Sequence, residues 1–380
     1  MTSTEVEPLI IRTSDRGQFK RCRQLWDFTS IMRGNYQYSP GVEPLDFGTA
    51  VHAGLEAYYD PTTWDGPSEV KEQLCLVAFK TSMNLWRERI RETGMWETMG
   101  ETFEEHWRLG IGMLEHYFLW APHEDRNYRP VRVEAEFEVP LPMDQSIMNM
   151  GDRFHWVDGY LHYEDTYQGV MRPVVYQGRI DLILQDLTDG TLWIYDHKTA
   201  AQFGQTEHLE LDQQCGSYVW ACKKILGLDV AGVIYGELRK KAPKDPDILQ
   251  SGLPSRNKSQ ATTPEKYRAY LAEKGIPEEP YQDFLQSLAN DGQQYFRRIE
   301  VHRSNDEMAA LERNIVNEAM DMIDYPRIYP NPSRWNCNGC KFRSPCLMVQ
   351  EGQDATWFLE HSNMYEKRTK GDVPVVDVPG

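Results

Sequence analysis

The stretches Gly178-Arg179-Ile180-Asp181 and Tyr195-Asp196-His197-Lys198 decide the fold of this 380-residue chain. Apolar residues adjoin both stretches, and Asp189-Gly190 between them is a strong signal for a tight hairpin turn. The two stretches are therefore predicted to lie on adjacent antiparallel strands. In that arrangement the side chains of Asp181, Asp196 and Lys198 can meet.

Asp196 and Lys198 are two residues apart, a spacing that puts both side chains on one face of a strand. A metal-dependent site needs this pairing, because a carboxylate holds the ion while a neighbouring lysine meets the phosphate or the attacking water. The alternative is a surface Asp and Lys beside a turn. The apolar hairpin favours a site, because charges at the edge of a core require a partner.

Hydrophobic periodicity predicts an α/β protein whose first third is mostly helical. We expect helices over 19–33, 47–59, 68–92, 101–120, 209–226, 264–274, 280–290 and 305–325, and strands over 131–139, 151–163, 174–185, 191–197, 230–236 and 295–302. The helix at 209–226 joins two strands and is expected to cross one face of the sheet. Residues 238–263 form a basic, Pro-rich loop that either contacts phosphates, through 239–244 with Arg256 and Lys258, or is simply solvated.

Composition sets limits on the function. The chain is 40% hydrophobic, enough for a real core, and it shows neither a bilayer-length apolar run nor a leader pattern, so we expect a cytoplasmic protein without a membrane partner. The net charge of -17 argues against a protein that coats nucleic acid with a uniformly basic surface. A nuclease is still compatible with this charge, because metal ions neutralise carboxylates and a confined basic groove can hold a strand.

The hairpin residues resemble the central motif of the PD-(D/E)xK nuclease superfamily, with Asp181 and Asp196 as the acids and Lys198 as the lysine. Gln214 and Tyr218 lie four apart on the following helix and therefore share a face. They resemble the Gln-x3-Tyr of RecB-like members, which implies that they position the DNA end or the catalytic lysine. By itself this spacing also fits an ordinary amphipathic helix.

Two upstream segments extend the resemblance. Residues 47–56 resemble the Gly-x3-His helix of the family, which implies that His52 is a metal ligand rather than a buried structural histidine. Glu134 resembles the acid that precedes the aspartate in the family. Glu136 and Glu138 share its strand face, so the sequence leaves open which of the three serves the site.

Three cysteines, Cys337, Cys340 and Cys346, crowd together in a pattern typical of metal ligation rather than of disulfides. The segment around Cys22 resembles the N-terminal helix of RecB-like nucleases, where one early cysteine joins three late ones around a [4Fe-4S] cluster. Tetrahedral zinc is the alternative. The remaining residues, Cys75, Cys215 and Cys222, are expected to be small core residues.

The resemblance implies an α/β restriction-endonuclease-like core, a mixed sheet flanked by helices, with helical insertions and an iron–sulfur subdomain. We expect one domain over 1–366 and a flexible tail over 367–380. Within it lie a helical part (14–125), the catalytic core (131–236), the basic loop with a helical insertion (238–325) and the cysteine segment (330–347).

The function implied is a DNA exonuclease that uses Mg2+ or Mn2+, held by His52, Asp181, Asp196 and an acid of the Glu134 region, with Lys198 acting electrostatically. The biological setting would be recombination, repair or replication of a phage or mobile element, with a possible protein partner. The alternatives are a CRISPR-adaptation nuclease and a non-catalytic protein that binds DNA ends. No Gly-x4-Gly-Lys-Ser/Thr occurs in this sequence, so we do not expect a helicase motor within it.

Overall fold

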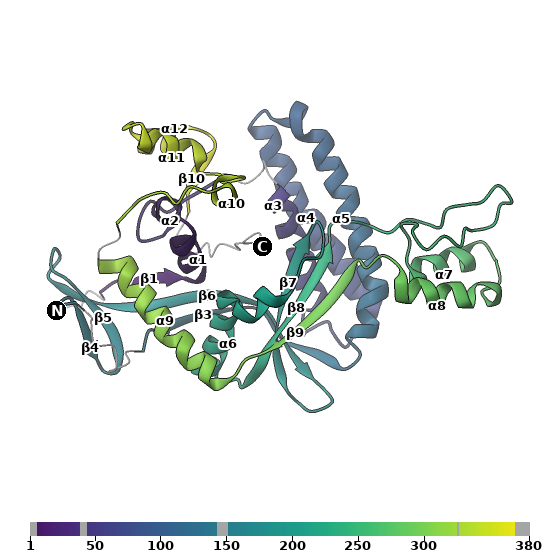
Figure 1. Ribbon diagram of the computed structural model, residues 1–380, viewed down its shortest axis with the longest axis horizontal. Coiled ribbons are helices and arrows are strands. Elements are labelled where there is room, and N and C mark those ends of the chain that lie inside the picture. Colours follow the sequence, from purple (N-terminus) through teal and green to yellow (C-terminus); the bar gives the residue numbers. More distant parts are fainter. Residues whose placement is uncertain (1–5, 39–43, 143–150, 325–326, 369–380) are drawn as a thin grey trace.

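The computed structural model describes residues 6–38, 44–142, 151–324 and 327–368. One mixed sheet of eight strands forms its centre, with the order β4-β5-β6-β7-β8-β9, while β1 and β3 also pair with β6 (Figure 1). The sheet strands are β1 Leu9–Arg12, β3 Tyr128–Pro140, β4 Phe154–Val157, β5 Tyr160–Asp165, β6 Val170–Asp186, β7 Leu192–Ala200, β8 Val230–Arg239 and β9 Phe296–His302. A separate pair is made by β2 Tyr36–Tyr38 and β10 Tyr365–Lys367.

Helices cover both faces of this sheet, as Figure 1 shows. They are α1 Thr13–Arg21, α2 Arg23–Thr29, α3 Pro44–Tyr58, α4 Ser68–Glu92, α5 Trp96–Glu124, α6 Gln213–Ala221, α7 Pro264–Glu273, α8 Gln282–Asp291, α9 Asn305–Asp324, α10 Arg334–Cys337, α11 Arg343–Gln350 and α12 Ala355–His361. Short 3-10 turns occur at Glu207–Leu211 and Glu279–Tyr281, and a π-turn occurs at Cys222–Leu226. Among the described residues, no helix is long and apolar enough to cross a membrane.

Strand β6 organises the sheet because its 17 residues meet several partners in succession. Along one edge it pairs with β3, from Val175 to Asp186. The other edge pairs in parallel with β1 over 174–177 and antiparallel with β7 over 182–185. Between these two partners, residues 178–180 pair with β3 alone, and Asp181 is skipped in the register. The Gly-Arg-Ile-Asp stretch therefore occupies a gap in the sheet, which we call the β6/β7 fork.

Two separate hydrophobic cores hold this sheet between its helical layers. Alternation along the strands sends Leu182, Leu184 and Tyr195 into the layer of α3, α4 and α5. The neighbours Ile183 and Ile194 point to the opposite layer, made by α1, α2, α6 and α9. The fork is consequently clamped on both sides by packed apolar side chains.

After the stretch that ends in Lys198, the chain crosses over from β7 to β8. The two strands run parallel in register, with Asp196 opposite Tyr235, and α6 makes the connection. Asp212 caps α6, because its side chain accepts hydrogen bonds from the backbone N–H groups of Gln214 and Cys215. The other carboxylate oxygen of Asp212 accepts the Tyr235 hydroxyl at 3.2 Å, which fixes the helix start to the sheet.

The C-terminal segment returns to the beginning of the chain. Strand β10 pairs with β2, and a small core forms there from Phe28, Tyr36, Phe342, Leu359 and Tyr365. In Figure 1 this segment lies beside α1 and α2, whereas α7 and α8 project from the other side of the molecule. Contacts between the two ends of the chain therefore exist in the polypeptide itself.

Most predicted elements appear within a few residues of their expected bounds, and α4 has the predicted bounds of 68–92. The expected helix over 19–33 is wrong as a single element, because extended backbone at Cys22, with φ of −164°, divides it into α1 and α2. The expected strand over 151–163 is the hairpin of β4 and β5. Lys367 was expected to begin the flexible tail, but it is the last residue of β10. Residues 369–380 of the expected tail lie outside the described part of the chain.

Gly178 provides a test of the fork. A Cβ added to it would lie 2.5 Å from Thr13 Oγ1 and closer still to the Phe137 ring. Gly178→Ala should therefore lower the free energy of unfolding by about 1–3 kcal/mol, measured by urea denaturation. The control is Gly17→Ala, on an exposed helical position with open space, which should be neutral or stabilising. Equal stability of the two variants would contradict close packing at the fork.

Candidate active site

The β6/β7 fork brings the two motif stretches together. Asp181 is the last residue of the gap in β6, and Asp196 follows the last pair that joins β7 to β6, Leu182 with Tyr195. The backbone N–H of His197 donates to Asp181 Oδ2 at 3.3 Å across the opening. Side chains from both faces of the sheet can thus reach the same small region.

On the α3 side of the fork, His52 lies beside Asp181, with 3.5 Å between His52 Nδ1 and Asp181 Oδ2. A small cavity here is lined by His52, Glu56, Glu134, Asp181 and His197, together with apolar neighbours. Helix α3 supplies the histidine from a point far away in sequence. The structure therefore places His52 next to the acid that the sequence paired it with.

Glu134 is the glutamate of β3 that reaches this cavity. Its neighbours in β3 pair with Leu182 and Ile180, so Glu134 stands opposite Asp181. Its backbone is left-handed, with φ of 47°, a strained conformation that re-aims the side chain. By contrast, Glu136 stands opposite Arg179, and Glu138 accepts a hydrogen bond from Gln177.

Burial dominates the electrostatics of Glu134. It raises the pKa of the carboxyl to about 7; Arg179 opposes the shift, and the charges of Asp181 and Glu56 add to it. Arg179 Nε lies 2.5 Å from Glu134 Oε2. The acid cluster therefore favours a bound proton or a cation near neutral pH.

On the α6 side, Asp196 and Lys198 form an ion pair, with Lys198 Nζ 3.0 Å from Asp196 Oδ2. Asp196 is only 3% exposed. Burial raises its pKa, Lys198 lowers it, and the charge of Asp181 raises it again. The expected spacing of the carboxylate and the ammonium on one strand face is present.

Gln214 and Tyr218 lie on the helix that faces these acids. Gln214 Nε2 donates to the Tyr218 hydroxyl at 2.9 Å. Burial, with the charges of Asp181 and Asp196, raises the pKa of Tyr218 well above its usual value, so the phenol stays neutral. The charges of both aspartates therefore act on Tyr218, which is itself buried in the apolar core and packs against Phe137.

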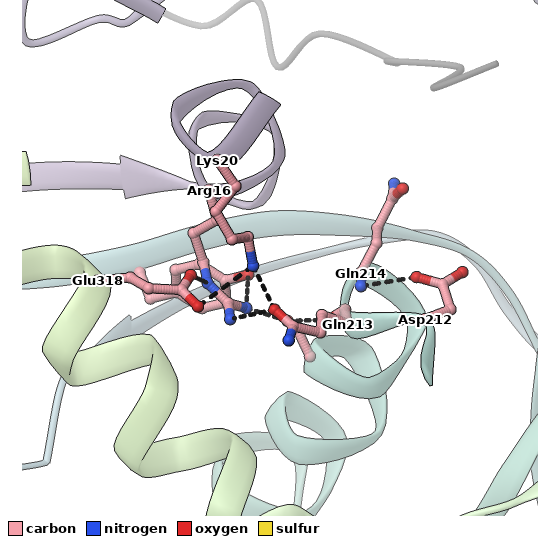
Figure 2. A network of polar contacts seen from close by, with 8 residues as sticks. Arg16, Lys20, Asp212, Gln213, Gln214 and Glu318 are labelled. Carbon is pink, nitrogen blue, oxygen red and sulfur yellow. Dashed lines mark hydrogen bonds and ion pairs between the residues drawn. The ribbon is translucent and has the colours of Figure 1, made fainter. Parts of the chain in front are cut away.

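A polar network holds the start of α6 in place (Figure 2). Arg16 of α1, almost fully buried, pairs with Glu318 of α9 at 2.7 Å and donates to Gln213 and Ser217 of α6. In Figure 2 the Gln214 side chain points away from this cluster, leaving its amide to Tyr218. The network joins α1, α6 and α9 behind the site.

The residues at the fork suit a divalent cation in kind. Carboxylates and an imidazole are ligands that Mg2+ and Mn2+ accept, and His52 Nε2 is buried with no hydrogen-bond partner among the described residues. In the described part of the chain, however, no three His, Cys, Asp or Glu side chains already form a metal-binding group. Asp181 lies between His52 and Glu134 on one side and Asp196 on the other, and it influences the charge of both acids.

The four predicted cluster cysteines come from both ends of the chain. Cys22, between α1 and α2, accepts the backbone N–H of Asn331 at 3.4 Å. Burial raises the pKa values of Cys340 and Cys346, and the thiols of Cys22 and Cys337 raise them further. The described residues hold no ready metal group at these cysteines. As predicted, Cys75, Cys215 and Cys222 are buried in the cores.

Three residues at the fork were not predicted from the sequence. Glu56 lies one helical turn after His52 on the same face of α3, so its spacing could have identified it. His197 lines the cavity from within the lysine motif, on the opposite strand face from Lys198. Arg179, inside the first motif stretch, holds Glu134.

Comparison with known families shows which family the chain belongs to. The model of the PD-(D/E)XK nuclease superfamily matches residues 14–347, most of the chain. The chain belongs to the PD-(D/E)XK nuclease superfamily. The matched region spans the fork and three of its surrounding helices, α1, α3 and α6, as well as the late cysteines. The family is one of metal-dependent nucleases, and DNA is the substrate that it suggests.

Other comparisons add little to the superfamily assignment. A solved structure titled "Crystal structure of SSO0001" resembles this PD-(D/E)XK chain at 13% identity, with a TM-score of 0.26. The match covers 68% of this chain and 79% of that one. No curated protein matches the chain.

The raised pKa of Glu134 has a measurable consequence for the metal-free protein. Its carboxyl contributes stability when protonated; this contribution is complete below about pH 4.5 and is lost as the pH rises to about 7. Glu134→Gln stays neutral at every pH. Its free energy of unfolding, relative to the native chain, should therefore rise across this window by on the order of 2 kcal/mol.

The measurement is urea denaturation in EDTA near pH 5 and pH 8. Glu138→Gln is the matched control on the same strand and should follow the native pH dependence. The assignment of Glu134 to the acid cluster fails if Glu134→Gln and Glu138→Gln change with pH in the same way.

Proposed function

We propose that this protein is a DNA exonuclease that requires Mg2+ or Mn2+. One observation supports it above the others: the fork gathers Asp181, Asp196 and Lys198 with His52 and Glu134, which come from four different elements. Burying this many ionisable groups is costly unless a ligand or ion compensates for it. A purely structural role gives no reason for their convergence.

His52, Asp181, Asp196 and Glu134 would hold the cation. A bound divalent ion would supply Lewis acidity at the scissile phosphate and favour ionisation of an attacking water. The raised pKa values of Glu134 and Asp196 would fall when a cation arrives, because its charge stabilises their ionised forms. Metal binding is therefore expected to release protons.

Lys198 acts electrostatically in this proposal. Its ammonium pairs with Asp196 and can donate hydrogen bonds to a phosphate oxygen, which would stabilise the charge that develops during hydrolysis. The neutral Tyr218 hydroxyl and the Gln214 amide lie next to the same acids and can orient the lysine or a phosphate oxygen. None of these groups needs to form a covalent intermediate.

The four cysteines are proposed to hold a structural [4Fe-4S] cluster. Thiolates suit iron–sulfur clusters and zinc alike, and zinc is the rival. The cluster would reinforce contacts that already join the chain ends, namely the pairing of β2 with β10 and the hydrogen bonds of Asn331 to Cys22 and Arg21. Hydrolysis transfers no electron, so the cluster's role would be structural.

The proposed setting is the cytoplasm, in recombination, repair or replication of a phage or mobile element, with a possible protein partner. A CRISPR-adaptation nuclease has the same chemistry and would be separated from this setting by gene neighbourhood. A non-catalytic protein that binds DNA ends is the third candidate. The intact acids and lysine argue against it, because DNA-end binding alone has no need for a metal-phosphate site.

The catalytic proposal is tested by cleavage of 5′- and 3′-end-labelled single- and double-stranded DNA in Mg2+ and Mn2+. Asp181→Ala, Asp196→Ala and Lys198→Ala should each lower the rate at least about a hundredfold, because they remove charge at the reacting phosphate. Asp229→Ala, at a side chain that is 96% exposed, is the matched control and should cleave normally. Normal cleavage by a folded Asp196→Ala protein would refute the assignment.

The cysteine proposal is tested by metal analysis and absorption. Native protein should be brown, with absorption near 400 nm and about four irons per chain. Cys22→Ser should lose colour and iron, whereas Cys75→Ser should keep both, even if its buried hydroxyl lowers stability. One zinc per chain with no colour would replace the iron–sulfur proposal and leave the nuclease proposal unaffected.

A further inference from the structure

A polar hollow lies beyond the lysine motif, at the carboxyl ends of β7 and β8. It is lined by Gln202, Phe203, Arg239, Asn290, Gly292 and Gln294. None of these lining residues is acidic, although the whole chain carries a net charge of -17. An anion approaching the fork from this end would therefore meet amides, one aromatic ring and one guanidinium.

Strand register places Arg239 on the same sheet face as the catalytic lysine. Lys198 pairs with Glu237, and Ala200 pairs with Arg239, two residues further along both strands. Directly paired residues share a face, and residues two apart return to it. Arg239 is thus displaced from Lys198 by roughly 7 Å along the strands and by one strand sideways, a spacing similar to that between neighbouring nucleotides.

In the part of the chain that the structure describes, the Arg239 guanidinium has no carboxylate partner. Its backbone N–H donates to the carbonyl of Tyr295 at 2.8 Å, which fixes the residue at the carboxyl end of β8. Its Nε is buried with no hydrogen-bond partner among the described residues, which also place no carboxylate within ion-pair distance of it. An incoming phosphate would satisfy that donor.

Phe203 adds an aromatic surface to the same hollow. Arg297 of β9 lies over its ring, 4.7 Å from the centroid, and donates to the carbonyl of Gly204 at 2.9 Å. Arg297 also pairs with Glu237, so the one acid between Lys198 and Arg239 on this face is neutralised. The ring is therefore oriented by its neighbours while it borders the hollow.

We infer that this hollow, the Phe203/Arg239 subsite, binds single-stranded DNA next to the scissile phosphate. Arg239 contacts a backbone phosphate, and Phe203 stacks on a base. Stacking on an aromatic ring beside a cation is how proteins hold single strands without reading their sequence. Duplex DNA keeps its bases paired and would leave the ring without a partner. The inference rests on the proposed nuclease function and assigns the path of its substrate.

The test measures binding of a fluorescent single-stranded oligonucleotide to the full chain, made cleavage-deficient by Asp196→Asn, in Mg2+. Arg239→Ala should weaken binding about tenfold and reduce the slope of log affinity against log salt by about 0.7, the value for one phosphate contact on a single strand. Arg313→Ala, at an exposed arginine of α9, is the matched loss of one charge and should change neither quantity.

Phe203 is tested by replacing single nucleotides of the oligonucleotide with abasic ones. One abasic position should weaken binding by about tenfold for the Asp196→Asn chain and for Phe203→Trp, because both retain a stacking ring. Phe203→Leu should bind more weakly and should be insensitive to that position. Tyr167→Ala removes an exposed aromatic elsewhere and should behave like the Asp196→Asn chain.

Three outcomes would overturn the subsite: no sensitive abasic position, an unchanged salt slope for Arg239→Ala, or losses confined to blunt duplex DNA. Cleavage by the wild-type chain is measured separately, so that the two proposals fail independently. Cleavage without these binding effects would reject the subsite alone. Binding effects without cleavage would reject the nuclease and support a single-strand-binding role for the hollow.

Discussion

The gap in strand β6 is the constraint on which the rest of this structure depends. Residues 178–180 pair with β3 on one edge and Asp181 follows them, while β1 and β7 occupy the other edge on either side of this stretch. A continuous strand at this point would fill the opening with backbone hydrogen bonds. The interruption instead lets Asp181 meet side chains from both helical layers. The gap begins with Gly178 because Thr13 and Phe137 leave no room for a Cβ there.

Rigid packing around the fork offsets the cost of gathering acids inside it. In the layer of α3, α4 and α5, the buried Arg298 of β9 pairs with Asp125 at the end of α5. It also donates hydrogen bonds to the hydroxyl groups of Tyr195 at 3.1 Å and Tyr59 at 3.3 Å. Arg16 makes the corresponding connection on the other layer, because it binds Glu318 of α9 and Ser217 of α6 and donates to the Tyr176 hydroxyl of β6 at 3.4 Å. Each helical layer is thus tied to the sheet by a buried arginine, which positions the site from behind.

Much of this arrangement could be predicted, because it follows from local patterns. Alternating apolar residues gave the strands, and the spacing of Asp196 and Lys198 put both on one face. His52 was predicted from its resemblance to the superfamily pattern. Hydrophobic periodicity could not have predicted it, because periodicity does not show that α3 places His52 beside Asp181, a residue far away in the sequence. The choice among Glu134, Glu136 and Glu138 needed the strand register and the left-handed backbone at Glu134, and neither leaves a trace in the sequence. Strands β1, β2 and β10 were missed because each is too short to show a period.

Anomalous diffraction from a manganese-soaked crystal tests whether the fork is a metal site, because it locates the ion without reference to activity. We expect a peak at the fork, within coordination distance of Asp181 and Asp196 and beside His52. The same crystal form of an Asp181→Ala variant should lose that peak. A fork without manganese, or a peak bound by other residues in a protein that cleaves DNA, would contradict a metal site at the fork.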